Sequence, residues 1–319
     1  MHVSFVIPLF NCLPLTQAML TSLRQTIPAG IDHEIVFVDD GSTDGTREWL
    51  KSLSGAEFRV VLNAQNVGYA AANNRGAAVA TGDLLCLLNN DLVLTPGWLE
   101  PMLSLRDALP QPGAIGNVQL NARTGEIDHT GIFVNAKGKP QHDQSLPGSR
   151  TRHRRMPAVT GACLMIGREQ WRRTGGFDEG FLNGCEDVDL CFRLRAEGCV
   201  NAVALKSVIR HHVSASSGRK RRDEANTRRL TLRWRAQLAE LGARAWCQNF
   251  VERDLTPASA FRAPLASWRI YAFAHGLRRT CPLEAKEGIT AAIDRELARW
   301  NEILGPAEQP TTPGCPSQA

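Results

Sequence analysis

The sequence lacks the features of membrane-spanning, secreted and zinc-binding proteins. No apolar run approaches the roughly 18 residues of a transmembrane helix. The start, MHVSFVIPLFNCLPL, is apolar but has neither the basic flank nor the small-residue cleavage site of a signal peptide. The nine cysteines form no C-x-x-C pair, and no Asn-x-Ser/Thr sequon occurs. We therefore expect buried free thiols, a reducing compartment and a cytoplasmic location.

Several common catalytic and nucleotide-binding signatures are also absent. The sequence has no G-x-G-x-x-G and no G-x-x-x-x-G-K-[ST] loop, so the usual dinucleotide and P-loop fingerprints fail. It has no G-x-S-x-G elbow and no H-E-x-x-H helix either. The net charge of +5 is too small to indicate nucleic-acid binding, and the basic runs at 150–155 and 219–222 lack interleaved aromatic residues. We therefore expect no nucleic-acid partner.

The first hundred residues alternate between two kinds of segment. Short apolar runs typical of strands lie at 3–7, 34–38, 58–62 and 84–88. Segments with helical spacing lie between them, at 16–26, 46–53 and 69–80. This order predicts an α/β fold, a mostly parallel sheet with helices on both faces. In such a sheet, ligands bind beyond the carboxyl ends of the strands.

The later part of the chain has a different pattern. After residue 112 the alternation weakens, although 160–166 has the pattern of one more buried strand. From residue 223 onward, apolar residues recur at helical spacing, and the last stretch, GPAEQPTTPGCPSQA, is polar and rich in proline. We therefore expect three parts: an α/β domain at 1–222, a C-terminal helical extension at 223–304 and a disordered tail at 305–319.

Acidic residues follow two of the predicted strands. The segment VDDGSTDGT places Asp39 and Asp40 at a strand end, where a carboxylate can accept hydrogen bonds from a base or a ribose. The segment LLCLLNND ends in Asp91, which can supply a hard oxygen ligand to a metal ion that bridges phosphates. Asp, Asn and Gly also form turns and caps, so each cluster taken alone has a structural explanation as well.

A third acidic cluster, EDVD, begins a predicted helix with Glu186, Asp187 and Asp189. The helix dipole favours acids there, which explains one or two of them structurally. Three acids in four positions nevertheless repel one another, and a preceding glycine-rich loop would leave them open to a cleft. A carboxylate at a helix start in a crevice can act as a general base, and we favour this function for the cluster.

Two histidines, His211 and His212, follow a strand-like segment. They can complete a metal site, or they can make structural hydrogen bonds. The basic run at 219–222 comes shortly after them. Such a run is usually a solvated face, but it can also neutralise a diphosphate or rest on an anionic membrane surface.

Together, these clusters resemble a known family. The matching segments occur in the family's order from residue 3 to about 218, and they are VSFVIPLFN, EIVFVDDGSTDGT, NVGYAAANNRGAAVATGDLLCLLNND, TGACLMIGREQWRRTGGFDEGF, EDVDLCFRLRAEG and HHVSASSG. The chain resembles the inverting, GT-A-fold nucleotide-sugar glycosyltransferases of family 2, especially the bacterial rhamnosyltransferase-like branch. The resemblance implies a Rossmann-like nucleotide-binding sheet and transfer of a sugar, with inversion, to a hydroxyl of a saccharide or lipid-linked acceptor in cell-surface polysaccharide synthesis.

The resemblance also implies roles for individual residues. Asp187 would be the catalytic base, with Glu186 beside it. The nucleotide pocket would include Pro8, Asn11, Asp39, Asp40, Asn66, Gly68, Asn74 and Asn90. The residues near the donor sugar and the acceptor would be Gly161, Ala162 and Asp189. A divalent metal ion, Mn²⁺ or Mg²⁺, would be held by Asp91 and His211, with His212 as the alternative histidine. The first Asp of the family's D-x-D motif is Asn89 here, so fewer charges would hold the ion.

Other functions stay open at this stage. A sugar nucleotidyltransferase shares a similar sheet and acidic metal site, although VIPLFNC lacks the glycine-rich basic loop that would hold a triphosphate. A non-catalytic nucleotide-sugar-binding module is the second alternative, and the intact EDVD motif argues against it. We expect a peripheral contact with the inner face of the cell membrane. The sequence identifies neither the base, the sugar nor the acceptor.

Overall fold

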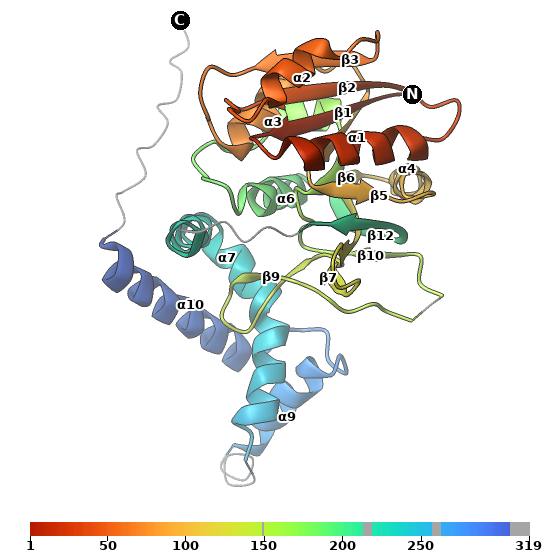
Figure 1. Ribbon diagram of the computed structural model, residues 1–319. Helices are drawn as coiled ribbons and strands as arrows, with labels where there is room; N and C mark the ends of the chain where they lie inside the picture. Colours follow the sequence, from red (N-terminus) through yellow and green to blue (C-terminus); the bar gives the residue numbers. More distant parts are fainter. Residues whose placement is uncertain (149, 213–218, 257–262, 307–319) are drawn as a thin grey trace, which may run out of the picture.

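The computed structural model describes residues 1–148, 150–212, 219–256 and 263–306. Its centre is one large mixed sheet with the strand order β10-β12-β6-β11-β4-β1-β2-β3 (Figure 1). Four strands of the first hundred residues run parallel to one another: β1 (His2–Leu9), β2 (Asp32–Asp39), β3 (Phe58–Leu62) and β4 (Leu84–Leu88). The helices that connect them are α1 (Leu13–Thr26), α2 (Thr46–Ser52) and α3 (Tyr69–Val79).

The second half of the sheet contains antiparallel pairs. The strand β11 (Cys163–Gly167) pairs antiparallel with β4 on one side and with β6 (Pro112–Asn121) on the other. The long strand β12 (Val200–His211) runs parallel to β6 and antiparallel to β5 (Leu92–Leu94). The remaining elements of this half are α4 (Leu99–Ala108), β7 (Ile127–His129), β8 (Ile132–Val134), β9 (Pro140–His142), β10 (His153–Arg155), α5 (Arg168–Thr174) and α6 (Glu186–Ala196).

Helices cover both faces of the sheet, so the central strands are apolar on both sides. Along β1, Val3, Phe5 and Ile7 belong to the hydrophobic core that also contains residues of α1 and α4. Val6 belongs to a second core, which contains residues of α3 and α6. This alternation explains why VSFVI is a continuous apolar run although strand side chains point to opposite faces in turn.

Three helices follow β12: α7 (Arg219–Arg253), α9 (Pro264–Ala274) and α10 (Leu283–Leu304). They extend away from the sheet in Figure 1, and α7 has a non-helical backbone at Trp234. None of the helices among the described residues is long and apolar enough to cross a membrane. The predicted fold class, including its C-terminal helical extension, is confirmed. The predicted boundary at residue 222 lies inside α7, and most of the predicted tail lies outside the described residues.

The register of the sheet brings distant polar residues to one edge. Leu9 of β1 lies opposite Asp39 of β2, and the following peptide N–H of Asp40 donates to the carbonyl of Leu9. At the end of β4, the N–H of Asn89 donates to the carbonyl of Ala162, just before β11. Because the ends of parallel strands meet at one edge, the acidic clusters after β2 and β4 face a common crevice, as predicted.

Candidate active site

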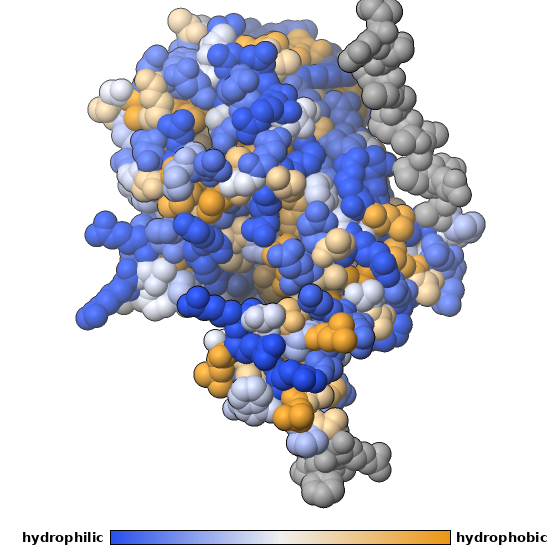
Figure 2. Space-filling model, turned by 180° about the vertical axis from the view of Figure 1, so that it is seen from behind, coloured by the Kyte–Doolittle hydropathy of each residue, from blue (hydrophilic) through white to orange (hydrophobic). Residues whose placement is uncertain are grey.

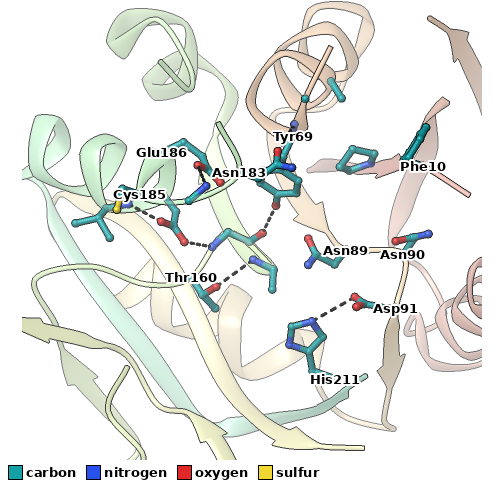
Figure 3. Close-up of a pocket in the computed structure, with 18 of the residues that line it drawn as sticks. Phe10, Tyr69, Asn89, Asn90, Asp91, Thr160, Asn183, Cys185, Glu186 and His211 are labelled. Carbon is teal, nitrogen blue, oxygen red and sulfur yellow. Dashed lines mark hydrogen bonds and ion pairs between the residues drawn. The ribbon is translucent and has the colours of Figure 1, made fainter. Parts of the chain in front are cut away.

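A cavity of about 570 Å³ opens at this edge. Figure 3 shows its wall, with Asn89, Asn90 and Asp91 on one side, Glu186 and Cys185 on the other, and Thr160 between them. The predicted site residues that line the cavity are Pro8, Asp40, Asn66, Gly68, Asn90, Asp91, Gly161, Ala162, Glu186, Asp187 and His211. They come from both halves of the sheet and from the start of α6, so the fold gathers most of the predicted site in one place.

Asp187 is the second residue of α6 and faces the cavity. Its Oδ2 accepts a hydrogen bond from the N–H of Gly161 at 2.8 Å, and its Oδ1 accepts one from the N–H of Val188 at 2.8 Å. Removal from water raises the pKa of Asp187, although these two N–H groups and the nearby His142 oppose the change. A carboxylate that is held in place and has a raised pKa is suited to accept a proton.

The loop before α6 is held in an unusual conformation. Asn183 and Cys185 have positive φ angles of 56° and 71°, a region that residues other than glycine rarely adopt. The side-chain oxygen of Asn183 accepts a hydrogen bond from the N–H of Tyr69 at 2.9 Å, which ties the loop to α3. Oε2 of Glu186 accepts one from the N–H of Gly184 at 2.6 Å. The start of α6, and with it Asp187, is therefore fixed by contacts on both sides.

The segment Thr160–Ala162 connects the two sides of the cavity. The N–H of Gly161 donates a hydrogen bond to Asp187, and the carbonyl of Gly161 accepts one from Oη of Tyr69 at 2.9 Å. A Cβ on Gly161 would lie 3.1 Å from that oxygen, so a larger residue would press on Tyr69. The carbonyl of Ala162 accepts the N–H of Asn89. This short segment therefore sets the position of Asp187 relative to the Asn-Asn-Asp turn.

Asp91 and His211 form the candidate metal site. Nε2 of His211 lies 3.3 Å from Oδ1 of Asp91, as the dashed line in Figure 3 shows. Oδ1 of Asn89, Oδ1 of Asp91 and Nδ1 of His211 are buried and have no hydrogen-bond partner among the described residues. Nδ1 of His211 also lies 3.9 Å from Oδ2 of Asp128. Buried polar atoms are almost always hydrogen-bonded, so atoms that have only such ion-pair contacts or none are available to a ligand. His212 contributes only its N–H, which donates to the carbonyl of Asp91, so the geometry favours His211.

The described residues contain no group of three or more His, Cys, Asp or Glu side chains that could hold a metal ion alone. Ions such as Mg²⁺ commonly take only one or two protein carboxylates and complete their shell with phosphate and water oxygens. The donor set of Asp91, His211 and the neutral oxygen of Asn89 fits an ion that arrives with a diphosphate.

Asp39 and Asn11 have protein partners and do not line the cavity in the described structure. The carboxylate of Asp39 is fully buried and accepts hydrogen bonds from Nε and Nη2 of Arg47 at 2.9 and 2.8 Å. Oδ1 of Asn11 accepts the N–H of Thr43 at 2.8 Å. Both residues therefore shape the turn after β2, and their placement gives no support to the predicted contact with the nucleotide.

Asn74 and Asp189 also lie away from the cavity wall as described. Asn74 exchanges two hydrogen bonds with the backbone of Phe177. Asp189 is fully buried and accepts hydrogen bonds from side-chain N–H groups of α6 and α7, namely Arg193 at 2.8 Å, Arg233 at 2.9 Å and Trp234 at 2.8 Å. Asp189 thus anchors the C-terminal helices to α6, and we assign it no contact with the donor sugar.

Asp40 lines the cavity, but its carboxylate is occupied by the protein. It accepts hydrogen bonds from the side chain of Asn63 at 2.8 Å and from the N–H groups of Val67 and Gly68 at 2.9 and 3.0 Å. The loop that contains the predicted Asn66 and Gly68 is therefore held against the end of β2. Asp40 therefore contributes to the pocket by holding this loop in place.

Sequence analysis missed several cavity residues, namely Phe10, Tyr69, Asp128, His142, Thr160 and Asn183. Phe10 follows the predicted first strand and is 48% exposed, and this large apolar residue two positions after Pro8 was an available signal. Asp128 and His142 come from the region between 113 and 157, where no motif pointed to a function.

The fold and the site define a class of protein before any relative is considered. A Rossmann-like sheet with a carboxylate and a histidine at the strand ends, and a buried carboxylate at a facing helix start, is the GT-A arrangement of nucleotide-sugar transferases. The chain belongs to one family within this class: the model of glycosyl transferase family 2 matches residues 4–169, just over half of its length.

Curated relatives agree with this assignment. The chain is 32% identical to the uncharacterized protein y4gI of Sinorhizobium fredii over 239 residues, which are 71% of this chain and 26% of that protein. It is 36% identical to the O-antigen biosynthesis protein RfbC of Myxococcus xanthus over 158 residues, 46% of this chain and 12% of that protein. It is 26% identical to an N-acetylglucosaminyl-diphospho-decaprenol L-rhamnosyltransferase of Mycobacterium tuberculosis over 210 residues, 58% of this chain and 68% of that protein. The matched region of the chain thus corresponds to about a quarter of the length of y4gI and about an eighth of the length of RfbC.

Solved structures share the fold. The crystal structure of GalNAc-T7 with UDP, GalNAc and Mn²⁺ superposes with a TM-score of 0.62 and 17% identity, covering 92% of this chain and 57% of that one. The mannosyltransferase PcManGT of Pyrobaculum calidifontis, in complex with GDP-Man and Mn²⁺, gives a TM-score of 0.56 and 19% identity, covering 92% and 86%. At these identities, the likeness establishes the GT-A fold alone.

Proposed function

We propose that this protein is an inverting glycosyltransferase. It would move a sugar from a nucleoside-diphosphate donor to a hydroxyl of a saccharide or lipid-linked acceptor, in the synthesis of a cell-surface polysaccharide. The observation that supports this most strongly is one cavity that contains both Asp187, whose pKa is raised, and the Asp91–His211 pair with its unpartnered buried atoms. The relatives named for O-antigen biosynthesis and rhamnosyl transfer support the same function.

The residues that would hold a divalent cation, Mn²⁺ or Mg²⁺, are Asp91, His211 and Asn89. When bound, the ion would supply positive charge beside the diphosphate that leaves. Two neighbours in fold were solved with Mn²⁺, which supports this cofactor. Pro8, Asn66, Gly68 and Asn90 would form the nucleotide wall, and the half-exposed ring of Phe10 offers an apolar surface for a base.

In the proposed reaction, a carboxylate oxygen of Asp187 takes the proton of the acceptor hydroxyl. The acceptor oxygen forms a bond to the anomeric carbon on the face opposite the diphosphate. The bond from that carbon to the diphosphate oxygen breaks, and its electron pair leaves with the nucleoside diphosphate, so the configuration inverts. The N–H groups of Gly161 and Val188 hold Asp187 in position for the proton transfer. Glu186 would stand beside the base.

Thermal-shift measurements with UDP, GDP, dTDP and their common sugars test the donor class. We expect one nucleotide series to raise the melting temperature in the presence of Mn²⁺, and chelator to remove the effect. A ligand at 100 times its Kd stabilises the folded state by about 2.7 kcal/mol, which is a shift of several degrees. Stabilisation by nucleoside triphosphates alone would instead favour a sugar nucleotidyltransferase, and donor binding without turnover on any acceptor would favour a non-catalytic module.

We also propose a peripheral contact with an anionic membrane surface, at the inner face of the cell membrane. The basic run at 219–222, which the sequence suggested for this contact, lies mainly outside the residues whose side chains are described. A different surface supports the proposal. Four large apolar residues between 265 and 283 are strongly exposed, namely Leu265 (74%), Trp268 (63%), Leu277 (75%) and Leu283 (66%). Leu265 and Trp268 lie on α9, Leu277 lies in the loop after it and Leu283 begins α10; we refer to this set of four residues as the α9 face.

Basic residues accompany the α9 face. Arg279 is exposed within the same stretch and Lys286 is exposed just after it. Figure 2 shows hydrophobic residues among hydrophilic ones on the narrow end of the molecule. Exposed aromatic and aliphatic side chains flanked by arginine and lysine suit the interface of an anionic bilayer. The described cysteines are all free, in keeping with a cytoplasmic location.

Vesicle flotation tests the membrane contact. We expect the protein to float with vesicles that contain phosphatidylglycerol and to stay in the lower fraction with pure phosphatidylcholine. Changing Trp268 and Leu277 to Ser should reduce the bound fraction several-fold, because membrane binding needs both burial of apolar side chains and attraction of basic residues to anionic lipids. Leu232→Ser, at another exposed leucine on α7, is the matched control. Unchanged flotation of the double variant would contradict the role of the α9 face.

A further inference from the structure

Two histidines that belong to none of the motifs used so far lie in contact beside the cavity. His129 ends β7 and is fully buried, whereas His142 ends β9, is exposed and lines the cavity. Their Nδ1 atoms are 3.3 Å apart, and their ring centroids are 4.8 Å apart. A buried polar ring that contacts a second ring on the cavity wall can determine how that second ring presents its hydrogen-bonding groups.

The hydrogen bonds of His129 define the tautomers of both rings. The backbone N–H of Thr160 points at Nε2 of His129 at 3.5 Å, which favours the tautomer in which this nitrogen accepts and carries no proton. Burial lowers the pKa of His129 and keeps its ring neutral, so its single proton lies on Nδ1, the atom that faces His142. Nδ1 of His142 must then accept, and the proton of His142 lies on Nε2.

The histidine pair and the base share one support. Thr160 binds His129, and the next residue, Gly161, donates its N–H to Asp187. His142 and Asp187 both line the cavity. The cavity wall therefore offers two complementary groups, a carboxylate that accepts a hydrogen bond and an imidazole N–H that donates one. Two neighbouring oxygens of a sugar can use both groups. The attacking hydroxyl gives its proton to the carboxylate, and the adjacent oxygen accepts a hydrogen bond from the imidazole N–H.

We propose that Nε2–H of His142 binds an acceptor-sugar oxygen adjacent to the attacking hydroxyl, and that His129 is a positioning residue that holds His142 in this tautomer. We assign His142 to the acceptor and not to the nucleotide-sugar donor, because the diphosphate of the donor is assigned to Asp91 and His211. This inference rests on the proposed function for the substrate. The substrate class that follows is a saccharide acceptor with an oxygen next to the hydroxyl that is glycosylated.

Nitrogen NMR of histidine-labelled protein, without any ligand, tests the tautomer. In the wild type, we expect His142 to carry its proton on Nε2. In His129→Leu, which replaces the buried ring by an apolar side chain, the Nδ1–H tautomer of His142 should gain population. A wild-type His142 with its proton on Nδ1 would overturn the inference. His153→Ala, at an exposed histidine on β10, is the control that should leave the signals of His142 unchanged.

Kinetics then test the substrate contact. With N-acetylglucosaminyl-diphospho-decaprenol as the acceptor probe, and the donor that the thermal-shift screen identifies, His142→Ala should raise the acceptor KM about tenfold and leave the donor KM unchanged. His142→Gln should recover part of the loss, since it retains an N–H donor, and His129→Leu should raise the acceptor KM although His142 is intact. An unchanged acceptor KM in His142→Ala would overturn the contact. Absence of donor binding would instead contradict the proposed function, while the tautomer measurement would still stand.

Discussion

Asp187→Asn is expected to lower the rate of sugar transfer by a factor of about 10²–10⁴, the range that general-base catalysis usually contributes. The amide has nearly the same shape and can still accept the hydrogen bond from Gly161, but it cannot take a proton from the acceptor hydroxyl. Nucleotide binding should change little, because Asp187 lies apart from the residues assigned to the nucleotide. The measurement is release of nucleoside diphosphate under saturating donor and acceptor, together with the thermal shift by the donor.

The pH profile gives the same residue a second signature. The base must be ionised to act, and desolvation raises the pKa of Asp187. We therefore expect kcat/KM to decrease as the pH falls through a value above about 3.9, the ordinary pKa of aspartate. Glu197→Gln, at an exposed carboxylate that follows α6 and pairs with Arg173, is the matched control and should keep normal turnover. Normal turnover in Asp187→Asn would remove Asp187 from the catalytic role.

Asp91→Asn is expected to abolish the Mn²⁺-dependent part of nucleotide-sugar binding and to raise the Kd at least tenfold. The change keeps the volume of the side chain but removes the negative charge in the candidate metal site. The buried Oδ1 of Asp91 makes no hydrogen bond and lies 3.3 Å from Nε2 of His211, and asparagine keeps an oxygen at this place, so the melting temperature of the ligand-free protein should change little. Isothermal titration with and without chelator, and thermal melts without nucleotide, measure both effects.

The comparison variant is Asp107→Asn, at an exposed carboxylate that pairs with its neighbour Arg106. It should bind the donor like the wild type. If wild-type binding does not respond to chelator, or if Asp91→Asn binds normally in Mn²⁺, the metal assignment fails. In that case, positive groups of the protein would have to neutralise the departing diphosphate.

The strands of the first half and the gathering of acidic residues at their ends could be predicted from the sequence. Continuous apolar runs, such as LLCLL, need helices on both faces, and parallel strands deliver their ends to one edge. The segment GIFVN has a strand-like pattern and contains β8, but the short strands β7, β9 and β10 could not be predicted in this way. They have only three residues each, and their contacts depend on which distant segment pairs with them.

The direction of individual side chains separates the predicted site residues that line the cavity from those that do not. Asp39 and Asp40 are adjacent at a strand end, so their side chains point to opposite sides, and only Asp40 lines the cavity. Asp187 and Asp189 are two positions apart on α6, a spacing that places them on different faces of a helix. A motif that names both members of such a pair cannot assign both to one pocket, and the geometry of the element decides between them.

The hydrogen bonds of Asp189 determine whether the C-terminal helices of this chain can be replaced independently of its α/β part. Arg233 and Trp234 of α7 supply two of its partners, so the fully buried carboxylate is satisfied only when the C-terminal helices are docked. Removing partners from a buried charge is strongly destabilising. The α/β part and the helices after β12 are therefore not interchangeable modules. A chimera of this chain that replaces the helices after β12 must keep both partners of this carboxylate, or α6, the helix that bears the proposed base, loses part of its support.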